Sequence, residues 1–247
     1  MTNLFIGLAV GILMGLTGAG GALISIPIFI NYFHFDLKSA TVISLIIVFL
    51  GAFLNLIMQR RQPVYKISFG HFVVGALTAY LVKPWKEQIP DAYISLFLIA
   101  VSLYGMFSMW QKKKIHADPQ NGMKNLYLKI IISGAIVGLI TTLTGLGGAL
   151  ILVPFMIRWF GLSHAQAITT SLFSMTMVSL SSMFLQFELI ANRIELEQIL
   201  LISLGIIIAA QGIVILSKKI PATTLDMIRK ILFSGVVVYT CIAILTK

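Results

Sequence analysis

The stretch TGAGGALISIP at residues 17–27 returns as TGLGGALILVP at residues 144–154, which lies 127 positions later. At this offset, 15 of the 35 residues in 11–45 are identical to their counterparts in 138–172. Apolar segments can resemble one another by chance, but glycines and a proline at fixed spacing do not. We infer an internal duplication, with a first repeat at 1–110, a basic linker at 111–125 and a second repeat at 126–247.

The composition indicates an integral membrane protein. Of the 247 residues, 58% are hydrophobic and only 11% are charged, whereas a soluble domain carries about 25% charged residues. We therefore expect an all-α, multi-pass protein of the cell (inner or plasma) membrane. Its eight apolar stretches are 4–33, 40–58, 64–82, 92–110, 126–160, 167–187, 198–216 and 225–246.

Charge and motifs exclude several classes of protein. The net charge of +10 is typical of a membrane protein whose Lys and Arg gather in cytoplasmic loops, and no nucleic-acid partner is expected. The sequence contains no H-E-x-x-H, C-x-x-C, G-x-S-x-G or Walker motif, so we predict neither an enzyme nor a cofactor or metal site. The single cysteine, Cys241, lies in an apolar run and reads as a small buried residue.

The first and fifth apolar stretches are too long for one ordinary crossing. As a helix, 4–33 would measure about 45 Å, against a hydrocarbon core of about 30 Å. Glycines interrupt it near the middle, and each costs about 1 kcal/mol of helix stability relative to alanine. The pieces at 4–16 and 22–33 are too short to cross alone. Either the segment unwinds within one long crossing, or it forms a re-entrant hairpin.

The positive charges in the loops favour the hairpin. If all eight stretches cross, the 18 Lys and Arg residues divide ten to eight between the two sides, and with two hairpins they divide thirteen to five. The uneven division agrees with the positive-inside rule and places the central linker in the cytoplasm. Three full crossings per repeat then make the halves inverted repeats, a recurring plan among transporters. The poor side holds Lys38, Lys83, Lys86, Arg193 and Lys247.

The two glycine motifs are the predicted substrate site. A half-helix that starts after the glycines directs unpaired N–H groups and a positive dipole end toward the membrane interior, which favours an anion. The alternative is that the glycines serve only close helix packing. The candidate residues are Thr17, Gly18, Gly20, Gly21 and Ala22 in the first repeat, and Thr144, Gly145, Gly147, Gly148 and Ala149 in the second.

Polar residues follow each motif along one face of the next helix. The matching residues are Ser44/Ser171, Asn55/Ser182 and Gln59/Gln186. Within each repeat, the first and second of these positions are eleven residues apart, and the second and third are four apart. Thr170 directly precedes Ser171. Such a stripe either lines a cavity or holds neighbouring helices together. His71 is the best-placed ionisable residue at membrane depth, as a buried histidine or as a candidate proton relay.

The doubled G-x-G-G with a following proline, and the A-x-x-x-S at 40–44 and 167–171, resemble the sulfite exporter TauE/SafE family of membrane transporters. The resemblance covers essentially the whole chain. It implies a small anionic substrate such as sulfite or an organosulfonate. The first repeat reads SATVISL where the second reads AQAITTSL, so it lacks the threonine before the serine. The motif positions are Gly18, Gly20, Gly21, Pro27, Ser44, Gly145, Gly147, Gly148, Pro154 and Ser171.

Two hypotheses follow. The first is a secondary transporter of a sulfur oxyanion, with the lipid bilayer and the anion as its partners and a homo-oligomer as a compatible assembly. The second is a non-transporting membrane assembly or partner protein whose glycines serve packing. A cation carrier would need carboxylates at membrane depth, and the apolar stretches contain none in their centres.

Overall fold

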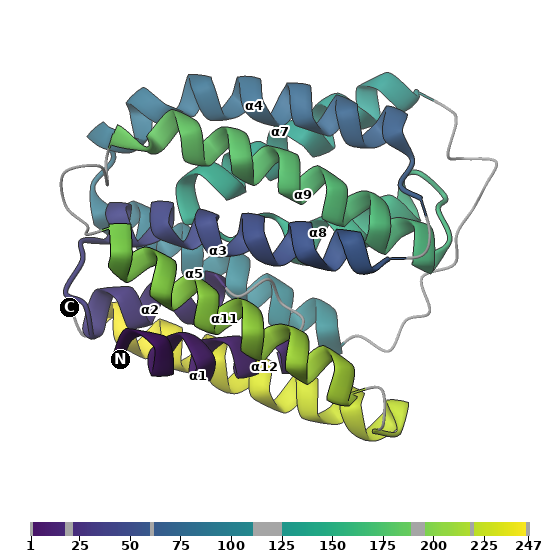
Figure 1. Ribbon diagram of the computed structural model, residues 1–247. Helices are drawn as coiled ribbons and strands as arrows, with labels where there is room; N and C mark the ends of the chain where they lie inside the picture. The colour runs from purple at the N-terminus through teal and green to yellow at the C-terminus, as the bar shows by residue number, and fades with distance from the viewer. Residues whose placement is uncertain are drawn as a thin grey trace.

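A computed structural model describes residues 2–17, 22–59, 62–110, 125–188, 196–217 and 220–245. Within these ranges every regular element is an α-helix, as the composition predicts (Figure 1). The helices are α1 (Thr2–Thr17), α2 (Ala22–Asn31), α3 (Leu37–Met58), α4 (Tyr65–Gln88), α5 (Asp91–Trp110), α7 (Leu126–Thr144), α8 (Ala149–Arg158), α9 (His164–Gln186), α11 (Leu196–Ser217) and α12 (Ala222–Leu245). Except for Asn125, the predicted linker at 111–125 lies outside the described residues.

Both over-long apolar stretches divide into two helices at the glycine motif. The first predicted repeat has α1 and α2 in place of one helix, and the second predicted repeat has α7 and α8. Helices α2 and α8 both start and end 127 positions apart, as do the starts of α3 and α9. Helices α3 and α9 are also capped alike. Asp36 precedes α3 and Ser163 precedes α9, and each side chain accepts a hydrogen bond from the backbone N–H three residues later.

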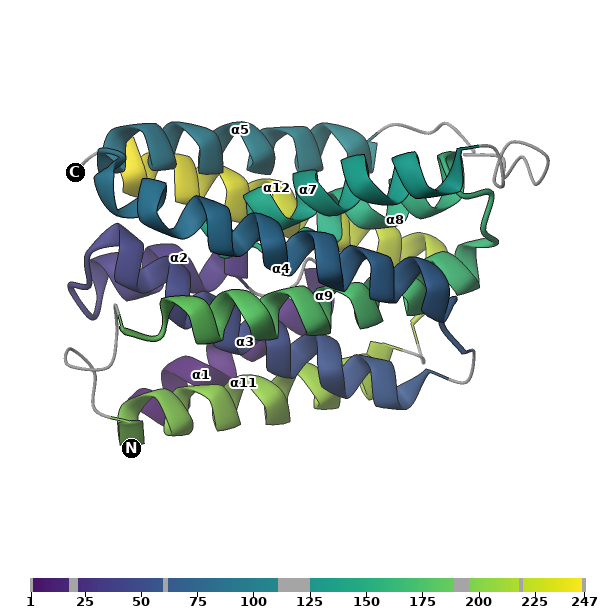
Figure 2. The ribbon, with the colours of Figure 1, turned by 90° about the horizontal axis from the view of Figure 1, so that it is seen from above.

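The two broken segments run in opposite senses. Figures 1 and 2 show α1 leaving the end of the bundle where both termini lie, and α2 returning toward that end. Helix α7 begins at the opposite end, and α8 returns there before α9 starts. The sequence left two arrangements open for these segments, and in the bundle each of them folds back on itself.

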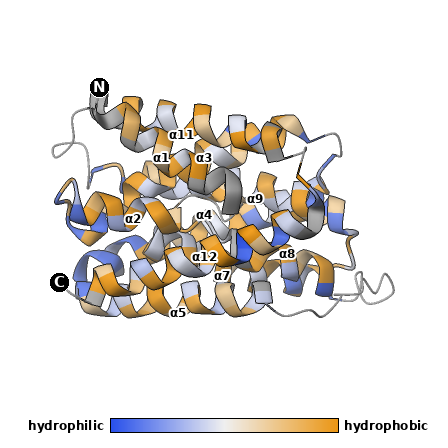
Figure 3. Ribbon diagram, turned by 90° about the horizontal axis from the view of Figure 1, so that it is seen from below, coloured by the Kyte–Doolittle hydropathy of each residue, from blue (hydrophilic) through white to orange (hydrophobic). Residues whose placement is uncertain are grey.

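Among the residues that the structure describes, six helices are long and apolar enough to cross a membrane: α3, α4, α5, α7, α9 and α12. Figure 3 shows hydrophobic residues along most of the helices and hydrophilic residues mainly toward the two ends. The two arms of the second broken segment differ in length, because α7 has 19 residues against 10 in α8. At the usual rise these arms measure about 28 Å and about 15 Å.

Exposed aromatic residues gather near both ends of the bundle. Tyr32, Trp85 and Tyr93 are exposed near the ends of α2 and α4 and the start of α5. Tyr65, Trp110 and Tyr127 are exposed at the start of α4, the end of α5 and the start of α7, which is the other end. Such belts are typical of the two membrane–water interfaces, where an apolar ring with a polar edge is most stable.

Glycines outside the two motifs bring parallel helices into close contact. A Cβ on Gly7 of α1 would collide with the carbonyl oxygen of Ile202 of α11, and one on Gly138 of α7 would lie 2.8 Å from the carbonyl oxygen of Gly75 of α4. In lipid, where apolar side chains gain nothing by leaving the solvent, such close backbone packing stabilises helix pairs.

Pro27 and Pro154 lie inside α2 and α8, and neither is in the first turn. A proline has no N–H for the carbonyl four residues before it, and for Pro27 that carbonyl belongs to Leu23. The Thr240 hydroxyl of α12 lies 3.0 Å from the Leu23 carbonyl oxygen and 2.8 Å from the Val236 carbonyl oxygen of its own helix, and its single proton is shared between them. The freed acceptor of α2 thus joins it to α12.

Candidate functional site

The break between α7 and α8 contains three glycines with left-handed backbone conformations. Gly145, Gly147 and Gly148 have φ values of 71°, 69° and 68°. A residue with a Cβ is strained there by about 1–2 kcal/mol. The Gly145 N–H donates to the Thr141 carbonyl and closes α7, while the Gly148 carbonyl accepts the first hydrogen bonds of α8 from Ile151 and Leu152. The motif in the sequence is therefore a requirement of this backbone.

This break packs against α3, which belongs to the other repeat. The Ser44 hydroxyl donates to the Thr41 carbonyl oxygen at 2.7 Å and lies 3.2 Å from the Gly145 carbonyl oxygen. A Cβ on Gly145 would collide with the Ser44 hydroxyl and the Thr41 carbonyl oxygen. Two predicted site residues from different repeats, Ser44 and Gly145, are thus in direct contact.

Beside this contact lies a buried lysine. Lys86, near the end of α4, has 1% relative exposure. Its Nζ donates to the Thr41 hydroxyl oxygen at 2.9 Å, to the Thr142 carbonyl oxygen at 2.8 Å and to Gln186 Oε1 at 2.6 Å. These acceptors come from α3, α7 and α9, so four helices of both repeats meet at one ammonium group. All three acceptors are neutral, and none of the ion pairs within the described ranges includes Lys86.

Further hydroxyls surround the Lys86 contacts. The Thr142 and Ser182 hydroxyl oxygens are 3.4 Å apart, and Gln186 Nε2 donates to the Ser182 carbonyl oxygen. Thr141 and Ser179, in the same turns of α7 and α9, have buried hydroxyl oxygens without a hydrogen-bond partner among the described residues. The Lys86 cluster, as we name Lys86, Thr41, Thr142, Ser182 and Gln186, thus surrounds a buried lysine with neutral acceptors and hydroxyls, while the charges of Lys38 and Asp36 lie near enough to act on it.

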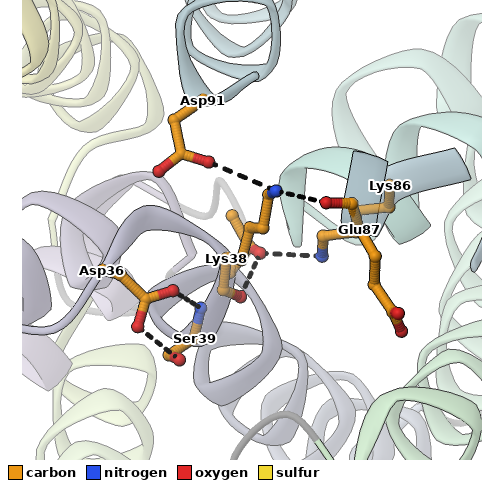
Figure 4. Close-up of polar contacts among 7 residues, drawn as sticks. Asp36, Lys38, Ser39, Lys86, Glu87 and Asp91 are labelled. Carbon is orange, nitrogen blue, oxygen red and sulfur yellow. Dashed lines mark hydrogen bonds and ion pairs between the residues drawn. The ribbon is translucent and has the colours of Figure 1, made fainter. Parts of the chain in front are cut away.

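A second lysine, Lys38, makes polar contacts beside the cluster (Figure 4). The Lys38 Nζ donates to the Glu87 carbonyl oxygen at 2.9 Å and lies 3.6 Å from the Asp91 carboxylate. The Lys38 carbonyl accepts from the Thr41 hydroxyl, which in turn accepts from Lys86. This lysine therefore ties the start of α3 to the end of α4 and the start of α5.

Other predicted site residues satisfy their hydrogen bonds elsewhere. Asn55 donates to the Gly51 carbonyl, and Ser171 donates to the carbonyls of Ala167 and Ile168 in its own helix. The Thr170 hydroxyl accepts from the Val64 N–H, and so holds the start of α4 against α9. Of these residues, only Thr170 holds neighbouring helices together, whereas Asn55 and Ser171 bond within their own helices.

His71 lies far along α4 from the cluster. Fifteen positions separate it from Lys86, which is about 22 Å along a helix. Its Nε2 is 2.6 Å from the Ser133 hydroxyl oxygen, and its ring meets Phe160 edge-on. It therefore makes no direct contact with the Lys86 cluster.

The remaining predicted residues are placed only in part. Thr144 is buried and donates to the Ile140 carbonyl. Ala22 is buried at the start of α2, and Ala149 begins α8. Thr17 ends α1, whereas Gly18, Gly20 and Gly21 lie outside the described residues.

The sequence missed Lys86, which it assigns to the loop after an apolar stretch at 64–82. In the structure α4 continues to Gln88, and Lys86 is buried in it. A signal was present, since the buried face of α4 includes His71, Gly75 and Ala79. Lys86 lies 11 positions after Gly75, which is three helical turns, so continuing the helix would have put it on this face.

A bundle of apolar helices with two interfacial aromatic belts defines this chain as a multi-pass membrane protein. Among the residues described, no group of three His, Cys, Asp or Glu side chains lies together to hold a metal ion. The family model for the sulfite exporter TauE/SafE matches residues 3–244, and the chain belongs to that family. The chain is also similar to a probable membrane transporter protein of Methanocaldococcus jannaschii, with 24% identity over 188 residues, covering 71% of this chain and 68% of the relative. No solved structure matches it.

Proposed function

We propose that this protein is a secondary transporter of a small anion, with sulfite, an organosulfonate or a related sulfur oxyanion as the substrate class. Membership of a family of membrane transporters supports transport, and the family's description supports the sulfur oxyanion. The observation that carries the proposal is the buried glycine break at 145–148, where the Gly145 carbonyl oxygen lies 3.2 Å from the Ser44 hydroxyl of α3.

The repeats are inverted relative to each other in this proposal, with the loop between α5 and α7 in the cytoplasm. The opposite senses of the two broken segments in Figures 1 and 2 support this arrangement, as does the 127-residue offset between helix bounds. Broken helices that meet between inverted repeats allow one repeat to rock against the other around a central site. In this proposal, the contact between Ser44 and Gly145 forms one wall of that central site.

The anion binds near the membrane interior at the start of α8 and at the matching start of α2. Left-handed glycines leave the backbone open to close approach, and the helix start supplies N–H donors and a positive dipole end. The family motif residues at 18–21 and 145–148 serve this role in the proposal. His71 remains a candidate for moving protons, since it lies buried in α4 but apart from the break.

The proposal is tested by uptake of labelled sulfite into proteoliposomes, with and without an imposed proton gradient. Sulfate, taurine, sulfoacetate and chloride serve as unlabelled competitors, and protein-free liposomes give the background. Saturable uptake that one competitor inhibits supports a carrier. Uptake equal to the background for every anion, by protein that is folded and monodisperse, would favour the non-transporting hypothesis.

A further inference from the structure

Among the described residues, Lys86 differs from the cations nearest to it in having no ion pair with a carboxylate, and the Asp36 charge acts on it only from a greater distance. Lys38 lies 3.6 Å from Asp91, and Lys83, one turn before Lys86, lies 2.9 Å from Glu188. Both are partly exposed, and each has an acidic partner. Lys86 is buried more deeply than either and has only two oxygens of neutral side chains and one backbone carbonyl.

The contacts of Lys86 are those of a charged group. An ammonium has three N–H donors and no acceptor, and three acceptors surround this nitrogen within 2.9 Å. A buried charge without a partner of opposite sign is costly. Charged residues inside membrane proteins are for this reason rare, and they typically mark paths of substrates or ions.

We infer that Lys86 is the cation that binds the anionic substrate, and that an oxygen of the substrate takes the place now held by the Gln186 side-chain oxygen. This inference rests on the proposed function and places the bound anion at the Lys86 cluster, which Thr142 joins three residues before the glycine break. The ligand is a small oxyanion, whose oxygens accept hydrogen bonds from the ammonium as Gln186 Oε1 does now.

Gln186 is the acceptor best able to leave. The Thr142 carbonyl belongs to the backbone of α7, and the Thr41 hydroxyl is also fixed by its own hydrogen bond to the Lys38 carbonyl. Gln186 is the last residue of α9, its side chain can rotate about three bonds, and its only other hydrogen bond among the described residues goes from Nε2 to the Ser182 carbonyl of its own helix. An anion that replaces it exchanges a neutral oxygen for a charged one, which makes a shorter and stronger hydrogen bond.

Hydroxyl donors for the remaining oxygens lie in the same turns. Thr141 and Ser179 are fully buried or nearly so, and their hydroxyls have no partner among the described residues. Ser179 is one turn from Ser182, whose hydroxyl oxygen is 3.4 Å from that of Thr142. A tetrahedral or pyramidal oxyanion at Lys86 would satisfy donors that are otherwise left unpaired.

The test uses purified full-length protein with sulfite as the probe, measured by thermal stabilisation and by uptake into proteoliposomes. Lys86→Gln removes the charge while keeping a polar group of similar length. We expect it to weaken the apparent affinity for sulfite by about tenfold or more, a factor that corresponds to about 1.4 kcal/mol. Lys83→Gln, one turn away on the same helix, is the matched control and should bind sulfite like the wild type.

Gln186→Glu tests the same inference without removing the lysine. A carboxylate in place of the amide gives Lys86 a permanent partner, so this variant should unfold at a higher temperature than the wild type and no longer bind or transport sulfite. Gain of stability with loss of binding is not expected of a residue that serves packing alone. The variant also keeps the test decisive if Lys86→Gln fails to fold.

Each outcome decides between the claims. Wild-type binding and uptake that both Lys86→Gln and Gln186→Glu abolish support the inference. Normal uptake and sulfite stabilisation in a folded Lys86→Gln or Gln186→Glu variant would overturn it and leave the proposed function standing. Absence of both uptake and stabilisation in the wild type, with sulfite and with the competing anions, would overturn the proposed function and the inference together.

Discussion

Replacing Gly145 with alanine tests whether the glycine motif is required by the backbone of the break. Gly145 has φ 71°, and its new Cβ would meet the Ser44 hydroxyl and the Thr41 carbonyl oxygen. The left-handed conformation costs about 1–2 kcal/mol for a residue with a Cβ. Overpacking against the fixed carbonyl of α3 adds about 1–3 kcal/mol. We expect Gly145→Ala to destabilise the fold by about 3 kcal/mol.

The assay is thermal unfolding of the purified protein in detergent. At about 2–4 °C per kcal/mol for a chain of this size, the Tm should fall by about 6–12 °C. The controls are Gly212→Ala and Gly235→Ala, because a Cβ at either helical position meets nothing within 4 Å. These should leave the Tm unchanged or raise it, since alanine favours helix over glycine by about 1 kcal/mol.

A Gly145→Ala protein that unfolds at the wild-type temperature would refute the reasoning, because the backbone would then tolerate a side chain at the break. A fall equal to that of the two controls would show that the loss of any glycine is enough. If Gly145→Ala lowers the Tm more than the controls do, and sulfite no longer raises the Tm of this variant, the break takes part in binding as well as in folding.

Three further predictions concern other parts of the bundle. Thr240→Val leaves the Leu23 carbonyl unpaired and should cost about 1–3 kcal/mol of stability, measured as a lower Tm with sulfite uptake per folded molecule unchanged; an unaltered Tm would contradict the assigned contact. His71→Phe should retain sulfite binding and lose the response of uptake to a proton gradient if His71 relays protons, and a retained response would exclude that role. Single cysteines at Lys38 and Lys112, in a protein with Cys241 replaced by serine, should be labelled by an impermeant reagent from opposite faces of the membrane, and labelling from one face would refute the inverted topology.

Several features of this fold could be predicted from the sequence because they depend on local chemistry. Composition and the lengths of the apolar stretches predict a helical membrane protein, and the family match confirms the transporter family that the doubled glycine motif indicates. The breaks at 17–22 and 144–149 follow from glycines, which lack a Cβ and disfavour helix wherever they cluster. The division into repeats and the roles of the individual glycines in binding stay predictions.

The polar stripe shows where local chemistry stops being informative. Ser44 and Ser171 occupy matching positions, yet Ser44 contacts the break of the other repeat while Ser171 bonds to its own helix. Asn55 and Ser182 match as well, and only Ser182 joins the Lys86 cluster. Two equal sequence patterns thus receive different partners, since the hydrogen bond that each hydroxyl makes depends on the helix packed against it.

By itself, the sequence determined the solvent, the helices and the places where they break, because these depend on side-chain polarity and on the absence of a Cβ at a few positions. Only the tertiary structure decided that Lys86 belongs to the interior. Its helix runs six residues beyond the apolar stretch that the sequence marks, and α3, α7 and α9 close around its ammonium with acceptors from residues 41, 142 and 186. From the sequence alone, a charged residue at the end of an apolar run is predicted to lie in a loop. Its burial depends on hydrogen-bond acceptors from helices far away in the chain, which only the tertiary structure shows.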